Sequence, residues 1–249
     1  MTREVTGSPR IVMAEHAGFC GGVQRAVALA EETGRAGEAV TLGALVHNPD
    51  VIAALERQGV HRVRNLAEAE GRPMIVPSHG LPLSVIERAS EMGLSIVDAT
   101  CPHVVRVQRE AARAARAGRT VVLVGDADHP EIVAVVSHCG SDVTVVSGPG
   151  DVEGTGVAPG QKVTVLAQTT QVRQVVEAVA QELRLRGAEV EQVDTICPAT
   201  AERQRAAIEL AGRVDLMVVI GGKASANTMR LADVCREIGV PVLRVESAT

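Results

Sequence analysis

The chain has 249 residues, a formal net charge of −5 and 46% hydrophobic residues. This length is enough for one large domain or for two to three small ones. The acidic balance disfavours a general nucleic-acid binder, since neutralising phosphates needs a basic face. Phe19 is the single residue of the Phe, Tyr or Trp type, so a platform that stacks RNA bases is disfavoured as well.

The amino-terminal region carries no export signal. Residues 1–10 are polar, Glu15 and His16 interrupt the apolar stretch that follows, and no apolar run approaches the ~20 residues of a membrane span. Five cysteines, an odd number, are poorly explained by disulfides, and the lack of a Cys-x-x-Cys pair disfavours a zinc ribbon. We therefore expect a cytoplasmic protein that binds neither membranes nor nucleic acid.

Short runs of Val, Ile and Leu alternate with helical stretches along most of the chain. This alternation predicts an α/β fold with mostly parallel strands. The predicted strands are Arg10–Met13, Val40–Leu42, Met74–Val76, Thr120–Val124, Val163–Leu166, Leu216–Ile220 and Val240–Arg244. The predicted helices are Val23–Glu32, Val51–Gln58, Ser84–Met92, Val104–Ala117, Val172–Arg186, Ala201–Ala211 and Thr228–Ile238.

Three cysteines occupy equivalent places in a weak internal repeat. The segments Asp98–Pro102 and Asp194–Pro198 are near copies, and each opens a predicted helix. Gly18–Gly22 opens a third helix. The cysteines of these three segments are Cys20, Cys101 and Cys197.

A strand and then a polar loop follow each of these cysteines at a nearly constant distance. The loops are His47-Asn48, His129-Pro130-Glu131 and Ser225-Ala226-Asn227, and two repeats carry a second one, Ser78-His79-Gly80 and Gln168-Thr169-Thr170. Open α/β sheets bind ligands at such strand ends. We expect three α/β units, 10–97, 98–193 and 194–249, with the cysteines around a pseudo-threefold axis. The same spacing would put the second polar loop of the third unit beyond Thr249. The third unit is therefore expected to be short at its carboxyl end.

Three thiolates that converge from three units suit an iron–sulfur cubane, because its irons prefer soft sulfur ligands. Three cysteines leave one iron without a protein ligand, and an open metal position indicates catalysis. We therefore expect one [4Fe–4S] cluster per chain on Cys20, Cys101 and Cys197, whose open iron serves the reduction of a small anionic substrate. The competing interpretation is that these are buried packing cysteines. Packing is the preferred interpretation for Cys139 and Cys235, which have no counterpart in the other repeats.

The polar loops carry hydrogen-bond donors that suit phosphate oxygens, assisted by helix N-termini. The set consists of His47, His79, His129, Thr169, Thr170, Ser225 and Asn227. A single histidine in such a loop is more often structural, but the matched positions in the repeats favour a ligand role. Glu131 could carry a proton there, since burial and negative neighbours raise the pKa of a carboxyl group. The alternative for Glu131 is a charge at the start of a helix that follows Pro130.

At these residues the chain resembles the LytB/IspH family of 4-hydroxy-3-methylbut-2-enyl diphosphate reductases, from about Ile11 to the last strand. The ordered set of motifs, more than any single one, carries the resemblance. It comprises Gly18–Ala26, Val46–Asn48, Ser78–Gly80, Asp98–Pro102, His129–Glu131, Gln168–Thr170, Asp194–Cys197, Gly222–Asn227 and Arg230-Leu231.

The resemblance implies a trefoil of three α/β units around a central cluster. It also implies a two-electron, two-proton reductive dehydroxylation that yields isopentenyl and dimethylallyl diphosphate, the last step of the methylerythritol phosphate route. Three roles follow for the matching residues: Cys20, Cys101 and Cys197 as cluster ligands; His47, His79, Ser225 and Asn227 as diphosphate ligands, assisted by His129; and Thr169 and Glu131 in orienting the hydroxyl and delivering protons. A ferredoxin or flavodoxin would supply the electrons, as no nucleotide-binding glycine fingerprint is present.

Two departures from the family pattern concern substrate binding. Ala226 stands where the family usually has a second serine, and nothing matches a later serine-containing loop. A paralogue that acts on a different hydroxylated substrate is therefore an alternative, and a non-catalytic iron–sulfur sensor is another. A plain nucleotide-binding protein is disfavoured, because Gly222-Lys223-Ala224 lacks the upstream glycine and the hydroxyl of a phosphate-binding loop.

Overall fold

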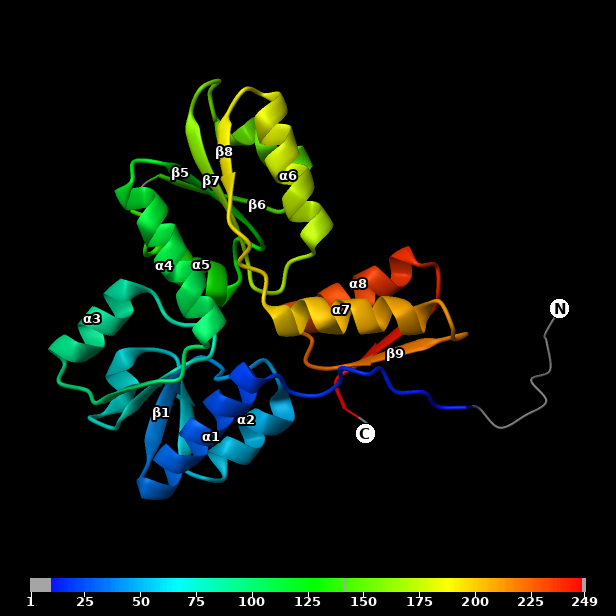
Figure 1. The fold of residues 1–249 in the computed structure, drawn as a ribbon. Coiled ribbons are helices and arrows are strands. Elements are labelled where there is room, and N and C mark those ends of the chain that lie inside the picture. Colours follow the sequence, from blue (N-terminus) through cyan, green and yellow to red (C-terminus); the bar gives the residue numbers. More distant parts are fainter. Residues whose placement is uncertain (1–9, 141, 248–249) are drawn as a thin grey trace.

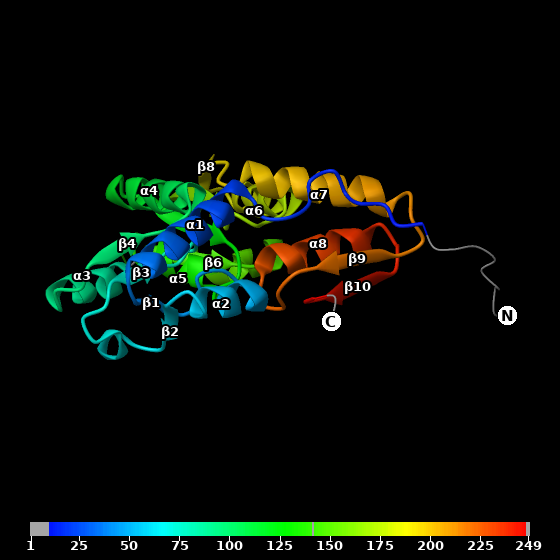
Figure 2. The same cartoon turned by 90° about the horizontal axis from the view of Figure 1, so that it is seen from below.

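Three α/β lobes meet at a common centre in the computed structural model, which describes residues 10–140 and 142–247 (Figure 1). One lobe runs from blue to cyan, the next from green to yellow, and the third from orange to red. Seen from below, α4 and α7 lie toward one face of the molecule, and α2 and β10 lie toward the other (Figure 2). The predicted α/β trefoil is confirmed, whereas the unit boundaries stay a prediction.

The first two lobes have the same order of parts. In the first lobe these are α1 (Gly21–Ala36), β1 (Ala39–Leu42), α2 (Pro49–Glu56), β2 (Val60–Val63), η1 (Leu66–Ala69), β3 (Met74–Val76), α3 (Leu83–Glu91) and β4 (Ile96–Asp98). In the second they are α4 (Pro102–Arg116), β5 (Thr120–Val124), α5 (Pro130–Val136), β6 (Val143–Val146), η2 (Pro149–Thr155), β7 (Lys162–Ala167), α6 (Arg173–Leu185) and β8 (Glu189–Gln192). Both sheets are parallel, with the orders β2-β1-β3-β4 and β6-β5-β7-β8.

The third lobe begins in the same way. It contains α7 (Pro198–Ala211), β9 (Met217–Ile220), α8 (Ala226–Glu237) and β10 (Val242–Val245). Strand β10 pairs with β9 as β2 pairs with β1 and as β6 pairs with β5. Within the described ranges the third sheet has two strands, whereas the other two sheets have four.

Alternate residues of the central strands pack into two helix layers. In β5, Val122 and Val124 are fully buried in a cluster with α6, while Val121 and Leu123 are fully buried in a cluster with α4 and α5. A parallel sheet that is covered on both faces needs apolar residues at consecutive positions. The sequences of these strands are therefore continuous apolar runs. In β9 the alternation is different, because Ile220 is 66% exposed. One face of the third sheet is therefore left open by the residues that the structure describes.

The strand predicted at Arg10–Met13 is wrong. This segment has no regular secondary structure, and the side chains of Ile11 and Met13 are 89% and 79% exposed. An isolated apolar segment does not form a strand without a partner for its backbone groups, and no strand in the described ranges pairs with it. The helix α5 and the strands β2, β4, β6 and β8 were not predicted from the sequence.

No helix in residues 10–140 and 142–247 combines the length and the apolar character that crossing a membrane requires.

The core of the second lobe provides a test of the packing. Leu183 on α6 is fully buried among the valines of β5 and β7, so Leu183→Ala should lower the free energy of unfolding by about 2–5 kcal/mol. Leu185 on the same helix is 75% exposed, and Leu185→Ala should change it by less than about 0.5 kcal/mol. Urea unfolding followed by circular dichroism measures both. Equal effects of the two substitutions would contradict this packing.

Candidate functional site

Cys20, Cys101 and Cys197 each lie immediately before a helix, in extended backbone at the starts of α1, α4 and α7. Pro102 and Pro198 fill the first helical position of α4 and α7, where a missing amide hydrogen costs nothing. The sequence thus ends each loop and begins each helix at the cysteine. A thiolate at this position is favoured by the helix dipole and the free amides of the first turn.

The three thiols lie close to one another. A Cβ atom added at Gly22 would lie 2.6 Å from Cys101 Sγ and 3.9 Å from Cys20 Sγ, so the glycine leaves space at the two sulfurs. Burial raises the pKa of the Cys101 thiol, hydrogen bonds from nearby backbone amides lower it, and the thiols of Cys197 and Cys20 raise it further. The effect of both other thiols on Cys101 indicates that the three cysteines lie near one another.

This donor set suits an iron–sulfur cluster, because its irons prefer soft sulfur ligands. In a cubane each cysteine binds a different iron, so its thiolates stand further apart than those of a zinc site. Three convergent thiols, with a glycine that keeps the space between two of them open, fit that arrangement.

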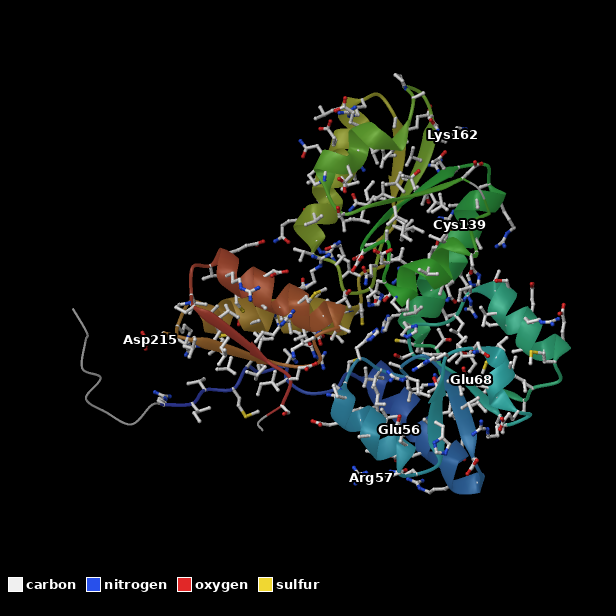
Figure 3. The ribbon with its side chains drawn as sticks, turned by 180° about the vertical axis from the view of Figure 1, so that it is seen from behind. Glu56, Arg57, Glu68, Cys139, Lys162 and Asp215 are labelled. Atoms are coloured by element: carbon white, nitrogen blue, oxygen red, sulfur yellow. The ribbon has the colours of Figure 1, made fainter. Side chains whose placement is uncertain are left out.

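Cys139 and Cys235 lie elsewhere, as predicted. Cys139 is buried in the core of the second lobe (Figure 3). Cys235, on α8, is fully buried in the core of the third lobe, where it packs against Ala207 and Ala211 of α7. Burial raises the pKa of the Cys139 thiol to about 11, which keeps it protonated and inert.

Backbone hydrogen bonds tie the second polar loops to the cysteines. The Cys101 amide donates to Ser78 O at 2.9 Å, and the Cys197 amide donates to Thr169 O at 3.0 Å. In both cases the loop of one lobe is fixed by the helix start of the next. Arg25 on α1 adds a bond from Nη1 to Thr100 O at 3.2 Å, which joins the first cysteine helix to the segment before Cys101.

Three histidines from three strand ends form one group. The ring of His47 lies 5.4 Å from that of His79 in a stacked arrangement and 5.4 Å from that of His129 in an edge-on arrangement. His79 and His129 are buried, and Nε2 of His47 is buried without a hydrogen-bond partner in the described part of the chain. The structure thus brings together three residues that are far apart in the sequence.

Burial disfavours the charged form of these three histidines. Burial lowers the pKa of His79 to about 4, with a further contribution from His47, and burial lowers the pKa of His129 to about 4 as well. Burial also lowers the pKa of His47. Nδ1 of His129 accepts a hydrogen bond from the Glu131 amide at 3.1 Å, so the proton of the neutral ring is on Nε2 and available to a ligand.

Glu131 is a buried carboxyl group held by Thr169. Its Oε1 accepts from the Thr169 amide at 2.7 Å, and its Oε2 is 2.7 Å from Thr169 Oγ1. Burial raises the pKa of Glu131, and the two hydrogen bonds from Thr169 partly offset that rise. Glu131 does lie in the first turn of α5, but it is only 3% exposed. Its carboxyl oxygens contact Thr169, at the end of the neighbouring strand β7. Glu131 is therefore more than a solvated charge at a helix start.

The third lobe contributes polar groups next to His47. A Cβ atom at Gly222 would overlap the carbonyl oxygen of His47, so the loop before α8 lies directly against the first lobe. Ser225 caps α8 by accepting from the Thr228 amide at 3.3 Å. Asn227 Oδ1 is buried, and among the described residues it has no hydrogen-bond partner; the same holds for Thr170 Oγ1 in the second lobe.

Gln168 belongs to this region and was missed from the sequence. It is only 2% exposed, its Oε1 accepts from the Asp126 amide at 3.1 Å, and its Nε2 has no partner within residues 10–140 and 142–247. Gln168 therefore joins the end of β7, where Thr169 follows, to the end of β5, which precedes the loop of His129. The Gln-Thr-Thr motif marked the loop, but only its hydroxyl groups were assigned a role.

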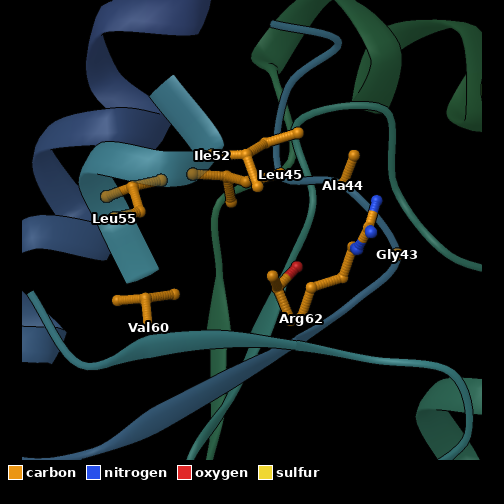
Figure 4. A pocket seen from close by; sticks show the side chains of 8 residues that line it. Gly43, Ala44, Leu45, Ile52, Leu55, Val60 and Arg62 are labelled. Atoms are coloured by element: carbon orange, nitrogen blue, oxygen red, sulfur yellow. The ribbon is translucent and has the colours of Figure 1, made fainter. Parts of the chain in front are cut away.

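Two hollows are lined by residues of the loops that carry the histidines or of their neighbouring elements. One, of about 360 Å³, lies between the strand ends of the second lobe and α8, and residues close to His129 and Asn227, among them Asp126 and Met229, line it. The other is a small pocket in the first lobe, where the Arg62 side chain extends past Gly43 and Ala44 opposite apolar residues of α2 (Figure 4). Its Ala44 carbonyl is 3.2 Å from His79 Nε2, so this pocket lies behind the histidines.

Curated relatives share most of the chain. The 4-hydroxy-3-methylbut-2-enyl diphosphate reductase of Citrifermentans bemidjiense is 44% identical over 242 residues, which cover 96% of this chain and 85% of the relative. The reductase of the same name from Geobacter sulfurreducens is 44% identical over 239 residues, with 96% and 84% covered.

Two solved structures have a similar fold. One is an (E)-4-hydroxy-3-methyl-but-2-enyl diphosphate reductase described as the terminal enzyme of the non-mevalonate pathway, with a TM-score of 0.71, 38% identity and coverage of 96% and 86%. The other is the E-1-hydroxy-2-methyl-but-2-enyl-4-diphosphate reductase of Plasmodium falciparum, with a TM-score of 0.87, 26% identity and coverage of 92% and 74%. The family model described as LytB protein matches residues 11–249. The chain therefore belongs to the LytB family, a family of iron–sulfur enzymes.

Proposed function

We propose that this chain reduces 4-hydroxy-3-methylbut-2-enyl diphosphate to isopentenyl and dimethylallyl diphosphate, the last step of the methylerythritol phosphate route to isoprenoids. The observation that carries the proposal is the position of Thr169. Its carbonyl accepts from the Cys197 amide, while its own amide and hydroxyl contact both oxygens of the buried Glu131. A proton donor is thereby held beside the three-thiol centre. The relatives carry the reductase name and give no support to a sensor or to a paralogue with another substrate.

The three thiols of Cys20, Cys101 and Cys197 would hold one [4Fe–4S] cluster, leaving one iron without a protein ligand. When bound, the cluster supplies the electrons for the reaction and an open iron position for the substrate hydroxyl. A ferredoxin or flavodoxin is the proposed source of those electrons. Gly22 keeps the region between the sulfurs of Cys20 and Cys101 open for this group.

The diphosphate would bind at the histidine group. Buried polar atoms without partners are costly, and in the described chain they include His47 Nε2, Thr170 Oγ1 and Asn227 Oδ1. The first two can donate to phosphate oxygens, and the amide of Asn227 donates when it is turned about its last torsion. The remaining proposed ligands are His79, His129, Thr169 and Ser225. A diphosphate would thus complete hydrogen bonds that the protein alone leaves open.

Glu131 would deliver protons through Thr169. A carboxyl group whose pKa is raised by burial stays protonated to higher pH, which is what a general acid requires. In the reaction the substrate's carbon–oxygen bond breaks, the hydroxyl takes one proton and leaves as water, and a second proton and two electrons end on the hydrocarbon. Thr169 Oγ1 lies 2.7 Å from Glu131 Oε2, so it can orient the substrate hydroxyl and relay the proton to it.

Cluster binding is tested by iron and sulfide counts on anaerobically prepared protein, which should give about four of each per chain. Replacing Cys20, Cys101 or Cys197 by Ser should abolish activity and remove or destabilise the cluster, because each thiolate binds one iron. Cys139→Ser and Cys235→Ser are the controls, and both should retain the cluster. A stable, colourless zinc protein would refute this assignment.

Proton delivery is tested by Glu131→Gln, which keeps the size of the side chain but removes its proton. Turnover should fall by roughly 10²-fold or more, the usual scale for loss of a general acid. Binding of the allylic diphosphate, followed by the spectral change of the cluster, should persist. Glu177→Gln on the exposed face of α6 should turn over like the wild type. Normal turnover by Glu131→Gln would show that the carboxyl group carries no proton in the reaction.

The histidine group predicts a pH dependence. Because the pKa of His79 and of His129 is lowered to about 4 from 6.5, the unfolded chain binds protons between these values that the folded chain does not. Stability should therefore be complete above pH 6.5 and should fall as the pH falls toward 4. A doubly substituted His79→Gln, His129→Gln variant should show a flatter profile in urea unfolding.

Pyrophosphate should reverse this effect, because an anion among the rings raises their pKa. Its binding at about pH 6 should take up protons, which calorimetry in two buffers of different ionisation enthalpy detects. Proton release, or no exchange, would contradict an anion site at these histidines.

A further inference from the structure

Two buried glutamines occupy the same position relative to the cysteines. Gln108 and Gln204 are each the seventh residue after a cysteine, on α4 and α7, and both are 8% exposed. We infer that Gln204 is a positioning residue for the Glu131–Thr169 pair. This inference rests on the proposed function. It adds to the reaction a residue that would act through Thr169 and Glu131 and not by touching the substrate.

Gln204 holds the loop that carries Thr169. Its Nε2 donates to Thr170 O at 3.4 Å and to Gln171 O at 3.3 Å, and the Cys197 amide donates to Thr169 O at 3.0 Å. Helix α7 and the cysteine that precedes it therefore supply donors to three consecutive carbonyl groups of one loop. The two glutamine bonds are long, but they are buried, where a carbonyl group that loses its donor is not rescued by water.

The opposite side of the same loop faces the proton donor. The Thr169 amide and hydroxyl contact Oε1 and Oε2 of Glu131, each at 2.7 Å. A shift of the loop would therefore displace both contacts together. A displacement of reacting groups by about 1 Å can slow a reaction by up to ~10²-fold. Loss of support for this loop should therefore lower the turnover rate more than the affinity for substrate.

Gln108 makes the corresponding approach in the preceding lobe. The Cys101 amide donates to Ser78 O, and a Cβ atom on Gly80 would lie 2.8 Å from Gln108 Nε2. Two different lobes thus place a glutamine amide, about two helical turns beyond the cysteine, against the polar loop of the lobe before it. This recurrence indicates that the amide serves loop positioning, since an apolar side chain would fill the same space.

The test uses Gln204→Met, which keeps the length of the side chain and removes its donor. In the cluster-loaded enzyme we expect kcat to fall by roughly 10-fold with KM changed less than ~2-fold, because the loop supports the reacting groups. Gln181→Met on α6, where Gln181 is exposed, is the matched control and should have wild-type kinetics. If Gln204→Met does not retain its cluster, Gln204→Leu, which is shorter but also lacks a donor, replaces it.

A double-mutant cycle separates positioning from general weakening of the structure. In a Glu131→Gln background, Gln204→Met should cost less than ~2-fold, because its effect passes through the missing proton. Additive losses, or a loss that appears in KM alone, would overturn this inference while leaving the proposed function intact. A wild-type chain that carries its cluster and does not reduce the allylic diphosphate would overturn the proposed function, and the inference with it.

Discussion

One repeated hydrogen bond joins the chemistry of this protein to its fold. The amide of a cysteine at the start of a helix donates to a carbonyl in the strand-end loop of the preceding lobe, at Cys101–Ser78 and again at Cys197–Thr169. Amides at a helix start need an acceptor from outside the helix, and the loop provides it. The cysteine and the loop residue are thereby joined directly through their backbones. Each lobe contributes a part of the site that is incomplete without its neighbour.

The site is built from buried polar groups whose charged forms are disfavoured by burial. Burial lowers the pKa of His79 and of His129 to about 4 and raises the pKa of Glu131, since a buried charge is costly. A diphosphate would bring the charge with it and would find donors that are already oriented. This preorganisation limits the reorganisation that accompanies binding and reaction.

In the two four-stranded sheets, the sequence predicted the interior strands better than the edges. The central strands β1, β3, β5 and β7 were all predicted, whereas β2, β4, β6 and β8, which were not, are the edges of the two four-stranded sheets. Edge strands such as Val60–Val63 and Glu189–Gln192 contain charged and polar residues, because one side of an edge faces solvent. In the site, the spacing of the cysteines pointed to the loops whose histidines lie together in the structure, while the roles of these residues stay a prediction. The role of Gln204 could not be predicted, because its partners are backbone carbonyl groups, which any sequence has.

Phe19 has an unusual consequence for spectroscopy. The chain contains no Trp and no Tyr, and this one phenylalanine, 46% exposed, directly precedes Cys20. Near-ultraviolet absorption of the polypeptide is therefore almost nil, and absorption bands in that range belong to whatever the thiolates bind. Electronic transitions between sulfur and metal can be followed here without the aromatic background that covers them in most proteins. The ring of Phe19 is at the same time a single aromatic reporter, in nuclear magnetic resonance, of events at the first cysteine.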